Sequence, residues 1–575
     1  MGKEKIKCRT ILWYLTFVGM AVNYMVRINI NMTVVVMVKQ RLNTKSAVET
    51  AECLTKDQIL LAEKKFNSTL DTFNNDVIPK ITGTYNESEF PDTILLPPTK
   101  MQKKEMTGGS IEKSLLRYFG FKIDEAGFDW NEYEQGLALG SFYWLHWVTQ
   151  VPGGILSKKY GPKLVYGVAN FVSSLLCFLM PMASYLSFDV LIFLRVFQGL
   201  ITGFAWPAMH TMVASWIPPN ERSKFVSAYL GSSFGVFINY PLFGAIISSS
   251  CWENVFHFCG IFGTVWYMAW CYFVYDTPAK HPRIAYDERQ YIEKSLGTTV
   301  QKKNYPTPWK EILTSRIVWM IVIAQWGGIW GLFTLMTQAP TYFKYIHGWD
   351  IKMSGFLSGL PHLLRMLFAL LFSWLGDYLL RNEKMSRTNV RKFGTAVCTI
   401  VKGLFVVGLA YSGCNSLAAI VLLTLAVGVH GSVSTGPLAA VVDIAPNFAG
   451  VTLGISGMVG VASGFVSPIV VGLLTLNNQT AKQWEYVFLI TAGMLIISGV
   501  LYCLFADSKL QSWNSPAEKP DVEMEYLNNT PKNVLKNDDT KKEEALNGTE
   551  PKQTLAVPIL LIEEVADRIS DSDEQ

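Results

Sequence analysis

The chain has 575 residues, of which 50% are hydrophobic and only 17% are charged, and its formal net charge is +4. Soluble proteins carry about 25% charged residues, and here the apolar residues gather in runs long enough to cross the roughly 30 Å of hydrocarbon in a bilayer. The composition excludes a soluble enzyme and, with no basic tract, excludes nucleic acid as a partner. It predicts an all-α polytopic membrane protein surrounded by lipid.

Apolar runs predict twelve membrane spans, separated by polar loops. The spans are expected near 11–38, 132–157, 163–183, 188–213, 223–250, 252–275, 316–343, 351–378, 391–412, 416–443, 450–476 and 484–506. The polar stretches are an N-terminus at 1–10, an outer loop at 39–131, a central loop at 276–315 and a tail at 507–575. The tail is hydrophilic and is expected to be disordered. We therefore expect two six-helix halves, 11–275 and 316–506.

Lys and Arg residues gather in alternate short loops, which sets the expected orientation. They precede the first span and follow the second, fourth and eighth spans, at Lys3, Lys5, Lys7, Arg9, Lys158, Lys159, Lys163, Arg222, Lys224, Arg381, Lys384, Arg387, Arg391 and Lys392. Both termini are therefore expected in the cytoplasm, and the loop 39–131 in the lumen or outside the cell.

This topology predicts which glycosylation sequons are used. Asn67 and Asn86 in the first outer loop, and Asn478 in the last one, are expected to carry glycans. The remaining sequons lie inside the membrane or in the cytoplasm and are expected to stay bare, at Asn31, Asn528 and Asn547.

The nine cysteines form no CxxC pair and show no metal-ligand spacing, so we expect neither a metal nor an organic cofactor. Cys53, Cys251 and Cys414 fall in predicted outer loops, where a disulfide can form. The sequence does not name the pair.

The two predicted halves have similar residue types at corresponding spans. Gly and charged residues follow the second span, at Gly161 and Lys163, and the eighth, at Gly376 and Asp377. Spans five and eleven are both rich in glycine, and each contains a proline. Small residues let helices approach closely, and each run alone is explained by ordinary packing. Their matched placement indicates a transporter built from two repeats, with its site between the halves.

The predicted membrane interior is cationic. Arg27, Arg195, Arg365 and Lys402 lie within spans, whereas acids stay at span ends. Such charges are costly in a bilayer and usually mark a site, so we expect a cavity that attracts an anion. Histidines also lie within the spans, at His146, His210, His362 and His430.

Each charge also has a structural interpretation. Arg27 and Arg195 either bind the substrate or pair with backbone carbonyls. Arg365 serves the site, gating or packing, and Lys402 is structural or lines a channel. The histidines otherwise pack between helices, with His146 the best candidate for the site. The aromatic residues of the sixth span are expected to face lipid or the interface, at Trp266, Tyr267, Trp270, Tyr272 and Phe273.

A set of motifs in fixed order resembles the anion:cation symporters of the major facilitator superfamily, which include sialin, vesicular glutamate transporters and type I sodium–phosphate cotransporters. The motifs are Tyr24-x-x-Arg27-x-Asn29, Gly140-Ser141-Phe142-Tyr143, Thr149-Gln150-Val151-Pro152-Gly153-Gly154, Arg195-x-x-Gln198-Gly199, Trp206-Pro207-Ala208-Met209-His210, Pro218-Pro219-x-Glu221-Arg222-Ser223, Asp276-Thr277-Pro278, Leu360-Pro361-His362-Leu363 and Asp443-Ile444-Ala445-Pro446. The resemblance spans roughly residues 10–515 and implies the major facilitator fold and alternating access.

The resemblance also implies that Arg27 and Arg195 bind the negative group of the substrate, since an arginine fork suits carboxylate or phosphate. The rest of the expected substrate-binding set is Tyr24, His146, Trp206, Arg365 and His362.

Several positions depart from the family pattern. Thr202 stands where sialin and the glutamate members have an acid linked to proton coupling, and His146 replaces a tyrosine. Gly328 replaces an arginine, and Ala440-Val441 replaces an Asn-His pair. These departures argue against vesicular glutamate loading and against proton symport through a span-four acid. His146 and Thr202 are the candidate coupling positions, and Na⁺ coupling, H⁺ coupling and potential-driven flux all stay open.

We expect a monomeric secondary transporter of inorganic phosphate or small organic carboxylates. A transporter-like receptor that binds an anion without moving it is the alternative, because the coupling acid is missing. An enzyme is not expected, since the chain shows no nucleophile–base pair, metal cluster or phosphate loop. The plasma membrane and a vesicular or lysosomal membrane both remain open as its location.

Overall fold

The fold was examined in a computed structural model, which describes residues 7–39, 53, 127–218, 225, 227–300 and 307–514. Within these ranges the chain is helical and forms no strand, apart from one isolated bridge between Val38 and Phe128. The first outer loop's sequons at Asn67 and Asn86, and the tail beyond 514, lie outside the described residues.

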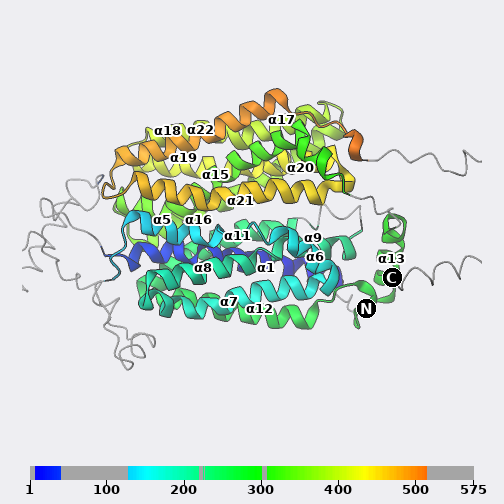
Figure 1. The fold of residues 1–575 in the computed structure, drawn as a ribbon, viewed down its shortest axis with the longest axis horizontal. Helices are drawn as coiled ribbons and strands as arrows, with labels where there is room; N and C mark the ends of the chain where they lie inside the picture. Colours follow the sequence, from blue (N-terminus) through cyan, green and yellow to red (C-terminus); the bar gives the residue numbers. More distant parts are fainter. Residues whose placement is uncertain are drawn as a thin grey trace, which may run out of the picture. The chain divides into compact units, whose positions relative to one another are not determined.

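The described part of the N-terminal half contains ten helical elements (Figure 1). They are α1 (Cys8–Met37), α5 (Glu132–Gly140), η2 (Ser141–Tyr143), α6 (Gln150–Tyr160), α7 (Pro162–Leu186), α8 (Phe188–Thr202), α9 (Ala205–Trp216), η4 (Ser227–Leu230), α11 (Gly231–Ser249) and α12 (Glu253–Phe273). The described part of the central loop adds η5 (Pro278–Lys280), α13 (Tyr286–Val300) and α14 (Trp309–Thr314).

The C-terminal half follows the same plan. Its elements are α15 (Arg316–Tyr345), α16 (Ile351–Arg381), α17 (Arg387–Ala396), the π-helical turn η6 (Val397–Val401), α18 (Lys402–Ala410), α19 (Ser416–Val429), η7 (His430–Ser434), α20 (Pro437–Ile444), η8 (Pro446–Phe448), α21 (Ala449–Leu474), α22 (Ala481–Phe505) and η9 (Ser512–Asn514). In Figure 1, α18 and α22 lie on one side of the bundle, α7 and α12 on the other, and α5, α11, α16 and α21 near the middle.

Ten helical segments of the described chain are long and apolar enough to cross a membrane. The expected second and sixth spans are not among them. The second is interrupted, because α5 and α6 are separated by η2 and an irregular turn at 144–149. The sixth is the 21-residue α12. The all-α fold is confirmed, and the helix order is consistent with twelve spans in two six-helix halves.

The two halves pack most extensively along α11 with α16 and α5 with α21. Glycines allow the close approach: an added Cβ at Gly136 of α5 would lie 2.5 Å from the Pro468 carbonyl oxygen of α21, and one at Gly355 of α16 would lie 2.6 Å from the Tyr240 carbonyl oxygen of α11. The phenol of Tyr240 also donates to the Met336 carbonyl of α15 at 2.6 Å. These contacts join the halves toward one end of the bundle.

The same face of α21 is uncovered toward the other end. Gly450, Gly454 and Gly457 continue the stripe that includes Gly464, and an added Cβ at any of these three would meet nothing within 4 Å. At Gly464 an added Cβ would instead lie 2.8 Å from the ring of Tyr143. The halves therefore pack together at one end and part at the other.

One disulfide marks the end at which the halves meet. It joins Cys53, in the first outer loop, to Cys414, between α18 and α19, and Cys251 is not part of a disulfide. Cys53 N–H also donates to the Ile346 carbonyl after α15, at 3.1 Å. We call this the disulfide end. Asn478 is exposed there, in the turn between α21 and α22, whereas Asn31 is buried and donates to the Tyr240 hydroxyl at 3.0 Å.

At the opposite end, hydrogen bonds and an ion pair join the central loop to the start of α1. The Glu288 carboxylate of α13 accepts hydrogen bonds from the backbone N–H groups of Cys8, at 2.9 Å, and Arg9, at 3.1 Å. It also pairs with the Arg9 guanidinium at 3.1 Å. A carboxylate at a helix N-terminus satisfies free N–H donors and complements the helix dipole.

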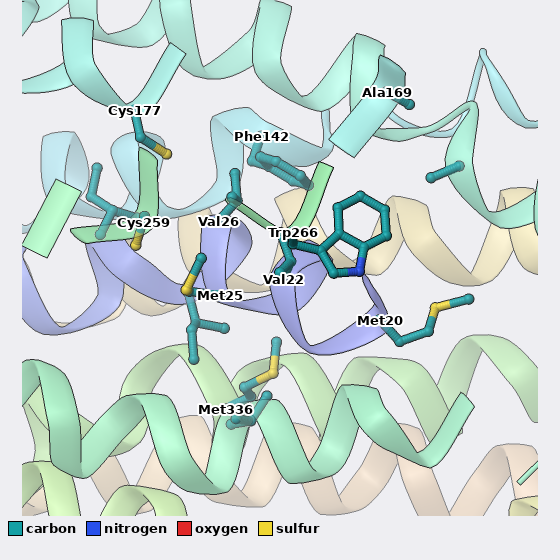
Figure 2. Close-up of a cluster of buried hydrophobic side chains, with 14 of the residues drawn as sticks. Met20, Val22, Met25, Val26, Phe142, Ala169, Cys177, Cys259, Trp266 and Met336 are labelled. Carbon is teal, nitrogen blue, oxygen red and sulfur yellow. The ribbon is translucent and has the colours of Figure 1, made fainter. Parts of the chain in front are cut away.

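The expectation that the sixth-span aromatics face lipid or the interface is wrong for two of them. Trp266 and Trp270 are buried, and their indole N–H groups donate to the carbonyls of Leu15 and Lys163, both at 3.0 Å. Figure 2 shows Trp266 beside Met20 and Val22 of α1. Tyr272 and Phe273 are exposed, as expected. A buried indole needs an acceptor, and neighbouring helices supply it.

The disulfide generates a stability prediction. Cys414→Ser, measured by thermal unfolding of the purified protein without reductant, is expected to lower the free energy of unfolding by about 2–4 kcal/mol, because the crosslink restricts the unfolded chain. Cys251→Ser is the matched control and should leave the melting temperature unchanged. Equal melting of wild type and Cys414→Ser would contradict the assignment.

Candidate functional site

The centre of the site is Arg27, near the middle of α1, with only 8% of its side chain surface exposed. Its Nη2 donates to Asn23 Oδ1 at 3.2 Å and lies 3.4 Å from His146 Nε2. The Nε–H group is buried and has no partner within the described structure. The guanidinium therefore keeps one unused donor in a region that holds no carboxylate beside it.

Aromatic rings surround this guanidinium. Its central carbon lies 4.6 Å from the ring centre of Tyr24, 5.3 Å from that of Phe142 and 5.6 Å from that of Tyr143. Ring faces are negative and attract a cation, with larger effect where water is excluded. The rings stabilise the positive charge without neutralising it, so the group can still bind an anion.

His146 lies in the turn between η2 and α6, and its contacts identify its tautomer. Nδ1 is 3.0 Å from the Gly199 carbonyl oxygen, which can only accept, so Nδ1 carries the proton. Nε2 is then an acceptor and receives hydrogen bonds from Arg27 and from Gln150 Nε2, the latter at 3.4 Å. A neutral imidazole thus holds the Arg27 side chain in place.

Arg195 of α8 is fully buried and points its donors at α1. Nη1 donates to the Val26 carbonyl at 3.3 Å, and Nη2 donates to the Arg27 carbonyl at 3.2 Å. Nη1 also approaches Gln198 Oε1 at 3.0 Å and Asn29 Oδ1 at 3.4 Å. The structure therefore places Arg195 against the backbone that carries Arg27, and the two guanidinium groups share the ring of Phe142.

Thr202 faces α7 instead of Arg27. Its hydroxyl donates to the Gln198 carbonyl at 2.6 Å and lies 2.6 Å from the Ser173 hydroxyl. Gln198 in turn donates to the Ser173 carbonyl at 2.8 Å and accepts from Arg195. Thr202 is thus linked to Arg195 through one glutamine.

The C-terminal half contributes Arg365 of α16. Its Nη1 donates to the Ser233 hydroxyl of α11 at 2.9 Å, so this hydrogen bond joins the two halves. His362, one turn before Arg365, is buried, and its Nδ1 has no partner within the described structure.

Trp206 belongs to a different cluster. It is 37% exposed, and its ring lies 5.7 Å from that of His210 and 5.1 Å from that of Tyr229. The structure thus brings Tyr24 and His146 each into contact with Arg27 and places Arg195 against the Arg27 backbone. Arg365 contacts Ser233 of α11, and Trp206 has other partners.

Some residues of the site are missing from the sequence-based set. Asn23 lies four residues before Arg27, a spacing that places both on one helix face. Phe142 and Tyr143 belong to a motif that the sequence already singled out. Ser233 has no local signal, because only the packing of α11 on α16 brings it to Arg365.

Comparisons with known proteins agree with this architecture. The family model described as Major Facilitator Superfamily matches residues 16–468, with a further match at 387–556. The chain is 36% identical to vesicular glutamate transporter 1 of Xenopus laevis over 410 residues, which cover 70% of this chain and 71% of that protein. It is 35% identical to vesicular glutamate transporter 2 of Mus musculus over 423 residues, 72% of each chain.

Among solved structures, a bacterial homolog of the human lysosomal transporter Spinster shares the fold, with a TM-score of 0.54 and 11% identity over 86% of this chain and 96% of that one. The extent of these matches places the chain in a known group. The chain belongs to the Major Facilitator Superfamily, in the family that includes the vesicular glutamate transporters.

Proposed function

We propose that this protein is a secondary transporter that moves anions across the membrane by alternating access. The observation that carries the proposal is the buried Arg27 guanidinium, which has an unused Nε–H donor and, in the described part of the chain, no carboxylate beside it. The relatives named as glutamate transporters support an anionic substrate. The substrate classes that fit an arginine fork are phosphate and small organic carboxylates.

In this proposal Arg27 binds the anionic group, and Tyr24 and His146 orient it. Arg365 is the second cation of the proposal, because an anion bound at Arg27 attracts a guanidinium carried by α16 of the other half. A ligand shifts a conformational equilibrium only through unequal interaction with the two states. An anion bound by both halves stabilises the state in which the halves are close, which is the occluded state of a transport cycle.

Arg195 has a different role in the proposal. Arg195 makes four hydrogen bonds to backbone and amide oxygens of α1 and α8. These bonds make it a positioning residue, which fixes where Arg27 lies relative to α8. The prediction that Arg195 itself binds the anion stays untested. To bind the anion, Arg195 would have to exchange its present hydrogen-bond partners for the anion during the transport cycle.

The disulfide supports the proposed orientation. Disulfides persist in oxidising compartments, so the disulfide end is assigned to the lumen or the outside and both termini to the cytoplasm. The uncovered face of α21 then makes this conformation open to the cytoplasm. A vesicular or lysosomal membrane suits the relatives' names, with the plasma membrane as the alternative. Glycans on Asn67, Asn86 and Asn478, and a monomeric state, remain part of the proposal.

The coupling ion is proposed from what surrounds Arg27. Thr202 has no titratable group, so it cannot carry a proton. Neutral His146 is the remaining candidate for a proton carrier beside the substrate. Na⁺ is the alternative coupling cation. Membership of a transporter family favours transport over the receptor alternative. Counterflow of labelled anion in proteoliposomes separates the two, because a receptor binds without exchange.

The first prediction concerns Arg27. Arg27→Ala is expected to lower anion uptake in proteoliposomes about 100-fold or more, since it removes charge-assisted hydrogen bonds of about 1.5–3 kcal/mol each. Arg381→Ala, which removes an exposed arginine of α16, is the control and should transport normally. Normal anion uptake by Arg27→Ala would refute the proposal.

A second prediction separates the two arginines. Arg195→Lys keeps the charge but cannot reach the same set of carbonyls, so it should lower the free energy of unfolding by about 3 kcal/mol. Arg27→Lys keeps the charge among the aromatic rings, so it should lower the free energy of unfolding by less than Arg195→Lys does and still lose uptake. If Arg195→Lys melts like wild type, the positioning role is wrong.

The third prediction concerns coupling at Thr202. Thr202→Glu places a carboxyl beside the Arg195–Gln198 network, where its protonation affects binding. We expect uptake by this variant to depend more steeply on pH than uptake by wild type. Thr202→Gln is the control, because glutamine has nearly the shape of glutamate and does not titrate. Identical pH profiles in all three proteins would refute a coupling role for this position.

A further inference from the structure

A small cavity lies between the two halves at the disulfide end. Its volume is about 10 Å³, which is room for one water-sized particle. Helix α5 of the N-terminal half lines it together with α15, α21 and the turn after α21, all from the C-terminal half. Six of the lining residues carry a side-chain oxygen, and they are Glu132, Gln135, Gln338, Thr341, Thr475 and Gln479.

Two of these side chains are buried without a hydrogen bond. Gln338 and Thr341 lie three residues apart on α15, a spacing that places both on one helix face. They are 5% and 6% exposed, and neither side chain hydrogen-bonds to another described residue. Buried polar groups are normally paired, because an unpaired one costs free energy. The cavity therefore offers an amide group and a hydroxyl group that still need a partner.

Glu132 gives the cavity a negative charge. It lies in the first turn of α5, and its Oε2 accepts a hydrogen bond from the Asn477 N–H group of the other half at 3.0 Å. Its Oε1 makes no hydrogen bond to a described residue, and no Lys or Arg of the described chain pairs with this carboxylate. One carboxylate oxygen thus remains available for a cation.

The other polar side chains keep oxygen lone pairs available. The Gln135 amide uses its Nε2 to donate to the Trp130 carbonyl at 3.2 Å, which leaves its Oε1 as an acceptor. The Thr475 hydroxyl donates to the Val471 carbonyl at 2.9 Å, so its oxygen can still accept. Carboxylate, amide and hydroxyl oxygens together are the ligand type that hard cations prefer.

We propose that this cavity is a sodium site, in which the Glu132 carboxylate and the neutral oxygens of Gln338 and Thr341 hold one Na⁺ between the halves. A single carboxylate matches a single positive charge. Ca²⁺ takes about six to eight oxygen ligands, and Mg²⁺ keeps several of its waters. A cavity with room for one water-sized particle does not accommodate either arrangement.

Such an ion stabilises one arrangement of the halves. Its ligands come from α5 on one side and α15 on the other, so the site is complete only while the halves touch at the disulfide end. A ligand that interacts unequally with two conformations favours the one it fits. The site itself does not depend on the proposed transport function, and it is separate from the choice of coupling cation, because neither Arg27 nor His146 lines the cavity.

The inference is tested by thermal unfolding of the purified full-length protein in detergent. Sodium chloride is titrated against choline chloride at constant ionic strength, so that chloride stays fixed. A ligand that binds only the folded state raises the melting temperature in a saturable way. We expect Na⁺ to do so in wild type and in Arg27→Ala, and potassium chloride to require a higher concentration, because K⁺ is the larger ion.

Two variants target the site. Glu132→Gln keeps the shape of the side chain and removes its charge, and should raise the half-saturating Na⁺ concentration about tenfold or more. Gln338→Leu keeps the charge and removes one neutral ligand, and should raise it about threefold or more. Glu485→Gln is the matched control, since this carboxylate lies at the same end, pairs with Lys482 and does not line the cavity.

Equilibrium binding of radioactive Na⁺ to the same proteins gives a second readout that does not depend on unfolding. The inference is overturned by the absence of saturable Na⁺ binding in wild type, by an unchanged half-saturation in either cavity variant, or by K⁺ acting as well as Na⁺. Loss of the effect in Arg27→Ala would also overturn it, by placing Na⁺ at the Arg27 site. Because the readout is cation binding, its failure leaves the anion-uptake experiments on Arg27 unaffected, and their failure leaves this result standing.

Discussion

The arrangement of this protein depends on four cations that lie within its described spans without a carboxylate partner there, Arg27, Arg195, Arg365 and Lys402. Each cation is stabilised by weaker groups: aromatic faces and an imidazole around Arg27, backbone and amide oxygens around Arg195, a hydroxyl at Arg365 and a carbonyl at Lys402. A carboxylate would neutralise these groups and would compete with an incoming anion. Neutral oxygens and ring faces lower the cost of burial and leave the charge available.

The hydrogen bonds of Arg195 link this electrostatic arrangement to the backbone. They run to the carbonyls of Val26 and Arg27, so α8 holds α1 at the level where the aromatic rings enclose Arg27. Gln198 extends the link to Ser173 and α7. The N-terminal half therefore presents Arg27 from three helices joined by hydrogen bonds, while Arg365 is carried by α16 of the other half.

Sequence reasoning predicted the chemistry of the site better than its packing. The length and composition of the apolar runs predicted the all-α fold, and the lone charges in these runs predicted a cationic interior. Arg27, Tyr24 and His146 do meet. The sequence could not show that Trp206 packs with Tyr229, or that Trp266 and Trp270 are buried, because these contacts join helices far apart in the chain. It likewise left the partner of Cys53 open, which depends on where two loops meet.

The disulfide has a topological consequence for the central loop. Cys53 follows the first helix of one half and Cys414 lies within the other, 361 residues away along the chain. The two halves are therefore connected twice, once through the peptide chain at 276–315 and once through sulfur at the opposite end of the bundle. A single cut in the central loop would therefore leave one covalent molecule, because the Cys53–Cys414 disulfide would still join the two halves.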